Sequence, residues 1–498
     1  MTTRRALRLD GLLGRADPAA PALLFRGGAI GHGELDSMVD RVATALAARI
    51  APGDRVAVFL PKLPEAVVAL FAISRAGGVA VPVNPLLRGP QVAHILTDSG
   101  AALLLTHAPR GALLAAPPCP VLTLEADWSR LLAAPAAPPD PPGGDALAML
   151  FYTSGSTGHP KGVMVSHANL RVGAASVASY LGTAADDRVL AVLPLSFDFG
   201  FSQLTTAFHA GAAAILLDYL APRDVVAASV RHGATQLAAV PPLWMQLAAL
   251  DWPETRLRTL SASGGRMPAP TVRALRRLFP DARLHLMYGL TEAFRSTTLP
   301  PELADTHPLS IGRAIPDAEV LVVRPDGSLT DPGEPGELVH CGPLVTKGYW
   351  RDPERTAERF RPAPPASRFG GVAVWSGDTV VREADGLLRF IGRTDETIKT
   401  MGMRVSPTEV EEVALASGAV AAAVALGIAD DAAGMRIRLI AVPAAGVAEA
   451  EAAAQLAAHF RREAPAHFAP ADIRFLERLP LSPNGKIDRA RLRCEHGR

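Results

Sequence analysis

The sequence predicts an α/β protein with more than one domain, and three observations support that prediction. The chain has 498 residues, which is more than one ordinary hydrophobic core accommodates. Strand-like and helix-like segments alternate over much of the chain, as they do in parallel sheets covered by helices. After Ser310 short strands are separated by Asp-Gly and Pro-Gly turns, which predicts a small antiparallel sheet or barrel.

The alternation is clearest between residues 55 and 84. The apolar run 55–61 predicts a buried strand, the segment 65–77 predicts a helix that ends at a glycine, and 78–84 predicts the next strand. A proline-rich passage, 115–145, is expected to form an irregular loop. Further strands are predicted at 146–153, 189–194, 212–217, 236–241 and 284–289.

The last third of the chain has a different texture, and it divides again at Gly392. Before that residue, short strands are predicted at 318–323, 336–342 and 387–392, with a loop at 362–367. After it, helices are predicted at 407–416 and 448–463, and strands at 419–428 and 437–442. We therefore expect two domains, 1–392 and 393–498.

The composition excludes several classes of partner. The formal net charge is +1, so nothing indicates nucleic acid or an acidic membrane surface. No apolar run is long enough to cross a membrane, and Asp10 and Arg15 interrupt any signal-peptide core. The three cysteines, Cys119, Cys341 and Cys494, have neither metal-ligand nor disulfide spacing. A cytoplasmic protein is expected.

The segment FYTSGSTGHPKG, 151–162, has the residue types that hold phosphate. It is not a P-loop, because the lysine follows a proline and no Ser or Thr comes after it. Glycines let backbone N–H groups turn toward an anion, hydroxyls add donors and the lysine adds a positive charge. The alternative is a flexible Ser/Gly surface loop. The candidate phosphate-binding residues are Thr153, Ser154, Gly155, Ser156, Thr157, Gly158 and Lys161.

This segment resembles the phosphate-binding motif of the adenylate-forming superfamily, which contains acyl-CoA synthetases, luciferases and peptide-synthetase adenylation domains. The resemblance covers nearly the whole chain, because further family motifs follow in the family's order. They are YGLTE (288–292), GELVHCGPLVTKGYW (336–350), SGD (376–378), GRTDETIKTMGMRVSPTEVEE (392–412) and SPNGKIDR (482–489). The resemblance implies a large N-terminal domain of two α/β layered subdomains plus a small β-barrel, followed by a mobile α+β C-terminal domain.

The resemblance also implies the chemistry. Members of this superfamily activate a carboxylate at the α-phosphorus of ATP, release pyrophosphate, and usually pass the acyl group to a thiol. By resemblance the 153–161 loop holds the departing pyrophosphate, Tyr288 stacks on adenine and Thr291 meets the α-phosphate. Glu292 is the expected Mg²⁺ ligand, because a carboxylate plus substrate phosphates is the usual way to hold this ion. Gly264 and Gly265 resemble the wall between the acyl and adenine pockets.

The remaining candidates belong to the later motifs. Asp378 fits an acceptor for ribose hydroxyls, and Arg393 is expected to reach the ribose or a phosphate. Lys486 follows an Asn-Gly turn dipeptide, where most lysines are simply solvated. It matches the family's C-terminal catalytic lysine, which bridges the carboxylate and the α-phosphate.

A hinge is implied at Asp395, about which the C-terminal domain rotates after adenylation. The second face then brings Lys399, Gly402 and Arg404 to the site, where the glycine leaves room for the incoming thiol arm. The catalytic set implied by resemblance is therefore Lys486, Thr291, Glu292 and Lys399.

The sequence leaves the acid and the thiol open. The acceptor is coenzyme A or the phosphopantetheine of a separate acyl or peptidyl carrier protein. Several stretches look most like acyl ligases of exosortase-type polysaccharide loci and like stand-alone aminoacyl-carrier ligases. Other uses of an adenylate, namely amide formation or nitrite activation, remain alternatives, as does an inactive nucleotide-binding regulator.

Asp198 bears on the identity of the acid. Many fatty acyl-CoA synthetases have a Pro-x-x-His pattern in this region, whereas this chain has Phe197-Asp198, similar to the Phe-Asp pair of peptide-synthetase domains. By that resemblance Asp198 binds the ammonium group of an amino acid, with Phe199 beside it. Aromatic neighbours make an unpaired carboxylate costly there. The alternative is an aspartate that caps a helix beginning near Gly200.

Lys486→Ala is expected to abolish adenylation but to leave thioester formation from supplied acyl-adenylate nearly intact, because this lysine acts in only one arrangement of the domains. Lys399→Ala is the reciprocal control and is expected to spare pyrophosphate exchange while impairing thioester formation. The two half-reactions are assayed separately in each variant. Equal loss of both half-reactions in Lys486→Ala would contradict the division of roles.

Overall fold

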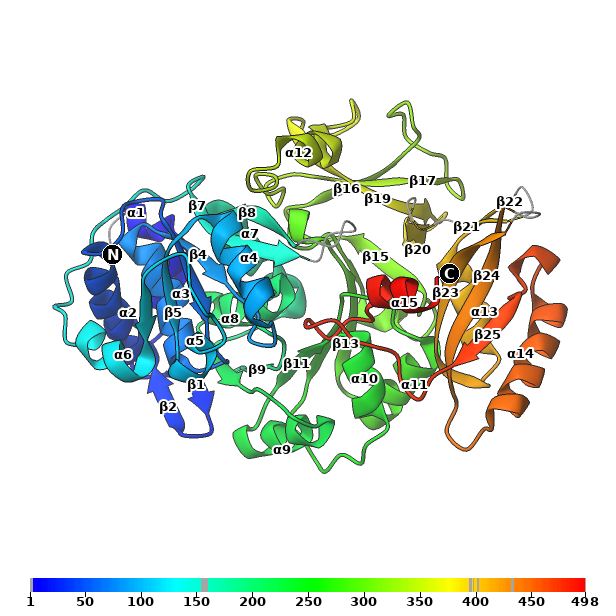
Figure 1. The fold of residues 1–498 in the computed structure, drawn as a ribbon, viewed down its shortest axis with the longest axis horizontal. Coiled ribbons are helices and arrows are strands. Elements are labelled where there is room, and N and C mark those ends of the chain that lie inside the picture. Colours follow the sequence, from blue (N-terminus) through cyan, green and yellow to red (C-terminus); the bar gives the residue numbers. More distant parts are fainter. Residues whose placement is uncertain are drawn as a thin grey trace. The chain divides into compact units, whose positions relative to one another are not determined.

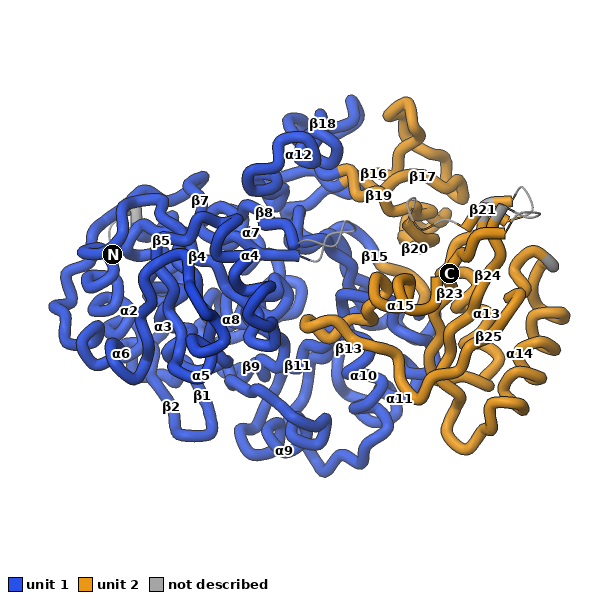
Figure 2. The backbone as a smooth tube through the Cα atoms, viewed as in Figure 1, with its two compact units in different colours: residues 1–308, 312–320, 340–374 blue, residues 309–311, 321–339, 375–498 orange. Residues whose placement is uncertain are grey.

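The computed structural model describes residues 3–153, 160–393, 396, 398–400, 403–430 and 434–497. The chain divides into two compact units, which Figure 2 shows in different colours. Unit 1 comprises Met1–Pro308, Gly312–Val320 and His340–Val374; unit 2 comprises Leu309–Ile311, Leu321–Val339 and Trp375–Arg498. Unit 2 begins earlier in the chain than the domain expected at 393–498, and the boundary after Gly392 stays a prediction.

Unit 1 contains two sheets that are parallel except at their edges, as the alternating pattern predicts (Figure 1). In the first sheet the strand order is β6-β5-β3-β4-β7-β8, and only β8 is antiparallel to its neighbour. Its strands are β3 (Arg55–Phe59), β4 (Val79–Pro82), β5 (Ala101–Thr106), β6 (Val121–Thr123), β7 (Leu147–Thr153) and β8 (Lys161–Ser166).

The second sheet has the order β14-β13-β12-β11-β9-β10-β1-β2 within unit 1, with antiparallel pairs only at its two ends. Its strands are β1 (Pro21–Phe25), β2 (Gly28–Gly31), β9 (Arg188–Ala191), β10 (Ala213–Leu216), β11 (Gln236–Ala239), β12 (Thr259–Ala262), β13 (Arg283–Tyr288) and β14 (Thr297–Leu299).

Helices α1 to α12 belong to unit 1 and supply much of its core together with the sheets. They are α1 (Thr3–Ala6), α2 (His32–Ala47), α3 (Pro64–Ala76), α4 (Gly89–Ser99), α5 (Ala108–Gly111), α6 (Leu124–Leu132), α7 (His167–Leu181), α8 (Asp198–Ala210), α9 (Pro222–His232), α10 (Pro241–Ala248), α11 (Ala269–Leu278) and α12 (Pro353–Arg359). Helix α3 is buried over most of its length and ends at Gly77, whose φ of 88° favours glycine. This confirms the helix predicted at 65–77.

Two expectations about unit 1 are wrong. The passage 115–145 is not wholly irregular, because it contains β6 and α6, which pair with β5 and pack on α2. Helix α8 begins at Asp198, not near Gly200. It begins earlier because its first turn lies against Pro194: a Cβ added to Gly200 would be 1.9 Å from the Pro194 carbonyl oxygen. The glycine therefore permits the close approach and does not mark the helix start.

Four strands have residues in both units: β15 (Ser310–Ala314), β16 (Glu319–Val323), β17 (Pro335–Cys341) and β19 (Val372–Arg382). In unit 1, β18 (Phe360–Pro362) pairs antiparallel with β19, and in unit 2 so does β20 (Leu388–Arg393). The short antiparallel strands predicted after Ser310 are therefore present.

The rest of unit 2 is an α+β arrangement around its own core. Its sheet has the strand order β22-β21-β24-β23, with β25 parallel to β24 and the other pairs antiparallel. The elements are β21 (Ile398–Thr400), β22 (Met403–Val405), α13 (Pro407–Ala416), β23 (Val420–Asp430), β24 (Gly434–Pro443), α14 (Glu449–Glu463), β25 (Asp472–Phe475) and α15 (Arg489–His496). They confirm the helices and strands predicted after Gly392. None of the helices in the described ranges is long and apolar enough to cross a membrane.

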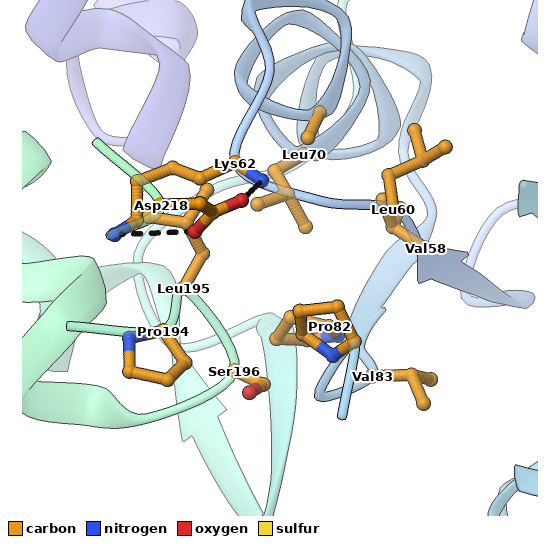
Figure 3. Close-up of a pocket in the computed structure, with 12 residues that line it drawn as sticks. Val58, Leu60, Lys62, Leu70, Pro82, Val83, Pro194, Leu195, Ser196 and Asp218 are labelled. Carbon is orange, nitrogen blue, oxygen red and sulfur yellow. Dashed lines mark hydrogen bonds and ion pairs between the residues drawn. The ribbon is translucent and has the colours of Figure 1, made fainter. Parts of the chain in front are cut away.

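Lys62 ties the two sheets of unit 1 together. It follows β3, and its Nζ donates to the Ala191 carbonyl at 2.8 Å and to the Leu217 carbonyl at 2.9 Å, where β9 and β10 end. Asp218 accepts a hydrogen bond from the Lys62 backbone and lies 3.7 Å from the ammonium group, as Figure 3 shows. Lys62 and Asp218 both line a cavity of about 20 Å³. Burial lowers the pKa of Lys62 to about 8, and the charge of Asp218 offsets only part of this effect.

We expect the free energy of unfolding to depend on the titration of Lys62. Because its pKa in the folded protein is about 8 and its ordinary value is 10.5, the unfolded chain binds more protons between these two pH values. Stability conferred by this group therefore rises with pH across that window. Denaturant unfolding of the native protein and of Lys62→Met across the window measures the effect. Parallel pH curves for the two proteins would contradict it.

Candidate active site

The segment between β13 and β14 carries residues that face two different clusters. A short 3₁₀ helix, Thr291–Ala293, follows the YG pair, and Phe294 then adopts a φ of 57°. That conformation is uncommon for a bulky residue and requires support from packing. The Phe294 ring is buried against helix α7 at Gly173, where a Cβ would lie 2.5 Å from the ring. The turn lets Glu292 and Arg295 make separate sets of contacts.

The first cluster consists of Glu292, Lys161 and Tyr349. The Tyr349 hydroxyl donates to Glu292 Oε1 at 2.6 Å, and Lys161 Nζ lies 3.4 Å from the same oxygen. The ammonium group also lies 3.8 Å from the centre of the Tyr349 ring. A cation on a ring face is attracted by the ring quadrupole. Glu292 is thus held by a hydrogen bond and an ion pair on one side.

Tyr349 reaches this cluster because its segment runs along β8. Met164 N donates to the Gly348 carbonyl and Trp350 N donates to the Gly162 carbonyl, at 2.9 and 2.8 Å. Gly348 has a φ of 102°, which favours glycine. The end of the GELVHCGPLVTKGYW motif therefore lies beside the strand that begins with Lys161.

The electrostatics of the pair favour the ionised form of Glu292. Burial raises the pKa of Glu292, but the charge of Lys161 and the hydrogen bond from Tyr349 outweigh it, and the pKa is lowered. Burial lowers the pKa of Lys161, and Glu292 opposes part of this shift. Glu292 is consequently ionised at neutral pH.

The residues here fit a magnesium ion bound together with a polyphosphate. Mg²⁺ is usually held by one or two carboxylates plus substrate phosphates. Both side-chain contacts of Glu292 are made by Oε1, so Oε2 is the oxygen available to a metal. Lys161 adds a positive charge on the same side.

The second cluster is built around Asp198, the first residue of α8. Its side chain is buried, and Oδ2 lies 3.4 Å from Arg295 Nη1 while Oδ1 accepts from the Thr291 hydroxyl at 3.3 Å. Both contacts are longer than the 2.7–2.9 Å typical of charge-assisted hydrogen bonds. The carboxylate is therefore paired but not tightly held.

Arg295 is buried too, and it has other partners. Its Nη1 donates to the Phe294 carbonyl at 2.7 Å and its Nη2 donates to the Ser202 hydroxyl at 3.1 Å. The guanidinium lies 4.4 Å above the Phe199 ring. Its Nε has no hydrogen-bond partner among the described residues.

A small cavity lies beside this cluster. Its volume is about 20 Å³, and Phe199, Ser202, Gln203, Thr206, Met287 and Arg295 are among its lining residues. Gln203 donates through Nε2 to the Ala238 carbonyl at 3.0 Å, while its Oε1 has no partner among the described residues, and neither has the Thr206 hydroxyl. The cavity thus has both a donor and an acceptor that are unpaired.

The other expected residues of unit 1 have the following positions. Gly264 follows β12 with a φ of 84°, and an added Cβ at Gly265 would contact Pro241 at 3.5 Å. Tyr288 ends β13 and is half-buried. Thr153 ends β7 opposite Lys161, and its buried hydroxyl has no partner among the described residues.

In unit 2, Asp378 and Arg393 are paired across β19 and β20. Arg393 Nη1 donates to Asp378 Oδ1 at 3.0 Å, and the carboxylate is buried. Lys486 is half-buried and follows a turn in which Gly485 N donates to the Ser482 carbonyl at 2.8 Å, with a φ of 78° at the glycine. The Asn-Gly turn predicted before this lysine is confirmed.

Some expected site residues lie outside the described part of the chain. The backbones of Lys399 and Arg404 are described and lie opposite each other in β21 and β22, but their side chains are not described. The others are Ser154, Gly155, Ser156, Thr157, Gly158, Asp395 and Gly402. Their expected roles stay predictions.

Sequence reasoning missed two residues of these clusters, Tyr349 and Arg295. Tyr349 lies within a motif that was recognised, but no spacing rule places its hydroxyl on Glu292. Arg295 follows Glu292 by three residues, so a buried cation near Asp198 could be suspected only if the turn at Phe294 were known.

Comparison with known proteins identifies related chains. The family model described as "AMP-binding enzyme" matches residues 14–350, and the model described as "AMP-binding enzyme C-terminal domain" matches residues 409–486. A feruloyl-CoA synthase of an Amycolatopsis species is 34% identical over 497 residues, covering 97% of each chain. Tyrocidine synthase 3 of Brevibacillus parabrevis is 33% identical over 494 residues, but this chain spans only 7% of its length.

A solved structure is similar over almost the entire chain. It is ATP-bound MatB from Rhodopseudomonas palustris, with a TM-score of 0.88, 27% identity and 99% of each chain covered. This likeness confirms the predicted mixed α/β fold with a large N-terminal and a smaller C-terminal domain.

Tyr349→Phe is expected to lower the affinity for Mg²⁺ in the presence of ATP by roughly tenfold or more, as loss of a group that orients a metal ligand usually does. The ring stays beneath Lys161, so the change is confined to the hydroxyl on Glu292. Calorimetric titration of Mg²⁺ into protein with ATP measures it. Tyr180→Phe, which removes a hydroxyl that contacts Met287, is the matched control. Equal Mg²⁺ affinity in the two variants would contradict the positioning role of Tyr349.

Proposed function

This chain belongs to the AMP-binding enzyme family, and on that premise we propose which acid it activates and which thiol receives the acyl group. Its reaction class is that of the AMP-forming acyl-CoA and aryl-CoA ligases. These ligases use ATP and Mg²⁺ to form an acyl-adenylate, and coenzyme A accepts the acyl group. The alternative of an inactive regulator is therefore set aside.

The acid is amine-bearing, and its ammonium group binds Asp198. The observation that supports this assignment is a buried carboxylate whose two contacts, at 3.3 and 3.4 Å, are both long. An ammonium group is a strong donor and would give this carboxylate a short partner. Gln203 lines the adjoining cavity, and its Oε1, which has no partner among the residues described, can accept a second N–H.

Binding at Asp198 also bears on Thr291. A hydroxyl has one proton to donate, and that of Thr291 is directed to Asp198. An ammonium group on Asp198 would release it, so that the hydroxyl could meet the α-phosphate. The amine would in this way prepare the adenylation site.

A second candidate is a ligase for a neutral acid, such as the aryl acid that the name feruloyl-CoA synthase indicates for that relative. The ion pair between Asp198 and Arg295 favours it, because Asp198 already has a cationic partner within the chain. With such an acid the pair stays closed and has a structural role.

For ATP, we assign the pyrophosphate to the 153–161 loop, adenine to Tyr288, and the wall between pockets to Gly264 and Gly265. Glu292 is the proposed Mg²⁺ ligand. Ribose binding by Asp378 and Arg393 is supported by their mutual hydrogen bond, which orients the carboxylate.

For the second half-reaction, Lys486 serves adenylation, and Lys399, Gly402 and Arg404 serve the thiol after rotation at Asp395. The proposed acceptor is coenzyme A or the phosphopantetheine of a carrier protein, and transfer in the cytoplasm is expected.

We expect Asp198→Asn to lose most activity toward an amine-bearing acid. The difference in activity between that acid and its analogue without the amine is expected to become smaller. A site with a buried carboxylate can reject a substrate that lacks the amine by roughly 10⁴-fold, because the carboxylate is then unpaired. Acid-dependent exchange of pyrophosphate into ATP, with matched pairs of acids, measures both quantities.

The control is Asp224→Asn at the start of α9, since Asp224 accepts hydrogen bonds from the nearby backbone N–H groups of Leu220 and Ala221. If the native enzyme turns over simple fatty, aryl or hydroxy acids as well as any amino acid, the amine site is wrong and Asp198 is structural.

A further inference from the structure

We propose that Arg295 binds a second carboxylate of the substrate, so that the acid is an amino dicarboxylate. This inference rests on the proposed function and deepens it, because it adds an anion site next to the ammonium site on Asp198. It is carried by the state of the Arg295 side chain, by the charge balance of the buried pair and by the lining of the cavity.

Arg295 has unused capacity for an anion. Two of its nitrogens have donor contacts, to the Phe294 carbonyl and the Ser202 hydroxyl. Its Nε is buried and has no hydrogen-bond partner among the residues that the structure describes. A guanidinium presents its N–H groups as a planar fork that matches the two oxygens of a carboxylate. The Phe199 ring lies against the guanidinium, 4.4 Å from its carbon to the ring centre.

Charge balance limits what can enter. Asp198 and Arg295 have opposite charges, so the ion pair is neutral. At 4% and 2% exposure, the two residues are almost wholly removed from water. An ammonium group that takes Asp198 from Arg295 leaves the guanidinium without its counter-charge. Breaking a buried pair by removing one partner is strongly unfavourable, because an uncompensated charge remains. A substrate that brings one positive and one negative group keeps both charges compensated.

The cavity lining has the same complementarity. Two of its lining side chains, Arg295 and Gln203, have a polar atom without a hydrogen-bond partner in the described part of the chain, a donor on the first and an acceptor on the second, and both side chains are at least 97% buried. The Thr206 hydroxyl, also unpaired, can serve either group. A compact molecule with adjacent ammonium and carboxylate groups satisfies these atoms. A long fatty chain does not, because it has no polar group to offer them.

The reaction decides which carboxylate of the acid can bind Arg295. One carboxylate of the acid must be free to attack ATP, so the carboxylate held by Arg295 is a different one. Aspartate and glutamate are common acids that have two carboxylates and an amine. An amino monocarboxylate would occupy Asp198 but leave Arg295 unpaired.

The test compares four probe classes in pyrophosphate exchange and in calorimetric binding to the full chain. They are aspartate and glutamate, the amino monocarboxylates β-alanine and 4-aminobutyrate, the dicarboxylates succinate and glutarate, and the neutral acids butyrate and benzoate. We expect the exchange rate and the affinity of an amino dicarboxylate to exceed those of each other class by roughly 10²-fold or more. Each of the other classes lacks a group to bind Asp198, Arg295 or both.

Arg295→Gln is expected to remove the preference for the second carboxylate while retaining the preference for the amine. The double variant Asp198→Asn/Arg295→Gln leaves no buried charge without a partner, so the fold stays testable, and it is expected to lose both preferences. Arg276→Gln, at a surface ion pair with Asp305, is the matched control and is expected to behave like the native enzyme.

The outcomes separate the two levels of the argument. If β-alanine or 4-aminobutyrate matches the amino dicarboxylates, the anion site is wrong and the ammonium site stands. If butyrate or benzoate matches them, both are wrong. The inference is also overturned if neither aspartate nor glutamate supports exchange, or if Arg295→Gln leaves the preference for a second carboxylate unchanged.

Discussion

The buried contact between the Asp198 carboxylate and the Arg295 guanidinium organises the candidate site of unit 1. It joins the first residue of helix α8 to the segment that follows Tyr288. Because both side chains are almost fully buried, neither charge can be left alone. The helix start, the turn at Phe294 and the stacking on Phe199 all contribute to keeping the two groups in contact. The same requirement restricts which substrates can enter between them.

The segment from Thr291 to Arg295 connects this pair to the phosphate side of the site. Glu292 has contacts with Lys161 and Tyr349, whereas Thr291 and Arg295 have contacts with Asp198. The two clusters are therefore separated by only a few residues of backbone. This arrangement suits an enzyme in which the acid and the nucleotide must meet.

Much of the fold follows from local pattern in the sequence. The run 55–84 predicted β3, α3 and β4, because a buried helix ended by Gly77 lies between two apolar segments. The prediction for 115–145 is wrong, because a high proline content favours an irregular loop over the short strand β6 and the helix α6. Their formation depends on tertiary contacts, of β6 with β5 and of α6 with α2. The start of α8 was misjudged for a related reason: Gly200 permits packing on Pro194, which no local pattern reveals.

The site was predicted less completely than the fold. Motif order gave Lys161 and Glu292 as partners in phosphate and metal binding, and their ion pair agrees with a shared location. Tyr349 and Arg295 could not be predicted in the same way, because their roles arise from the strand-like pairing of 347–350 with β8 and from the unusual backbone of Phe294. Asp198 was recognised as an exceptional carboxylate, but its partner within the chain was not.

The most direct measurement is a crystal structure of the enzyme with the adenylate analogue of an acid that supports exchange. We expect the ion pair to be open in that complex, with the substrate nitrogen within hydrogen-bond distance of Asp198 and a second carboxylate on the Arg295 guanidinium. An intact contact between Asp198 and Arg295, with the acid bound elsewhere, would contradict the account and assign this pair a purely structural role.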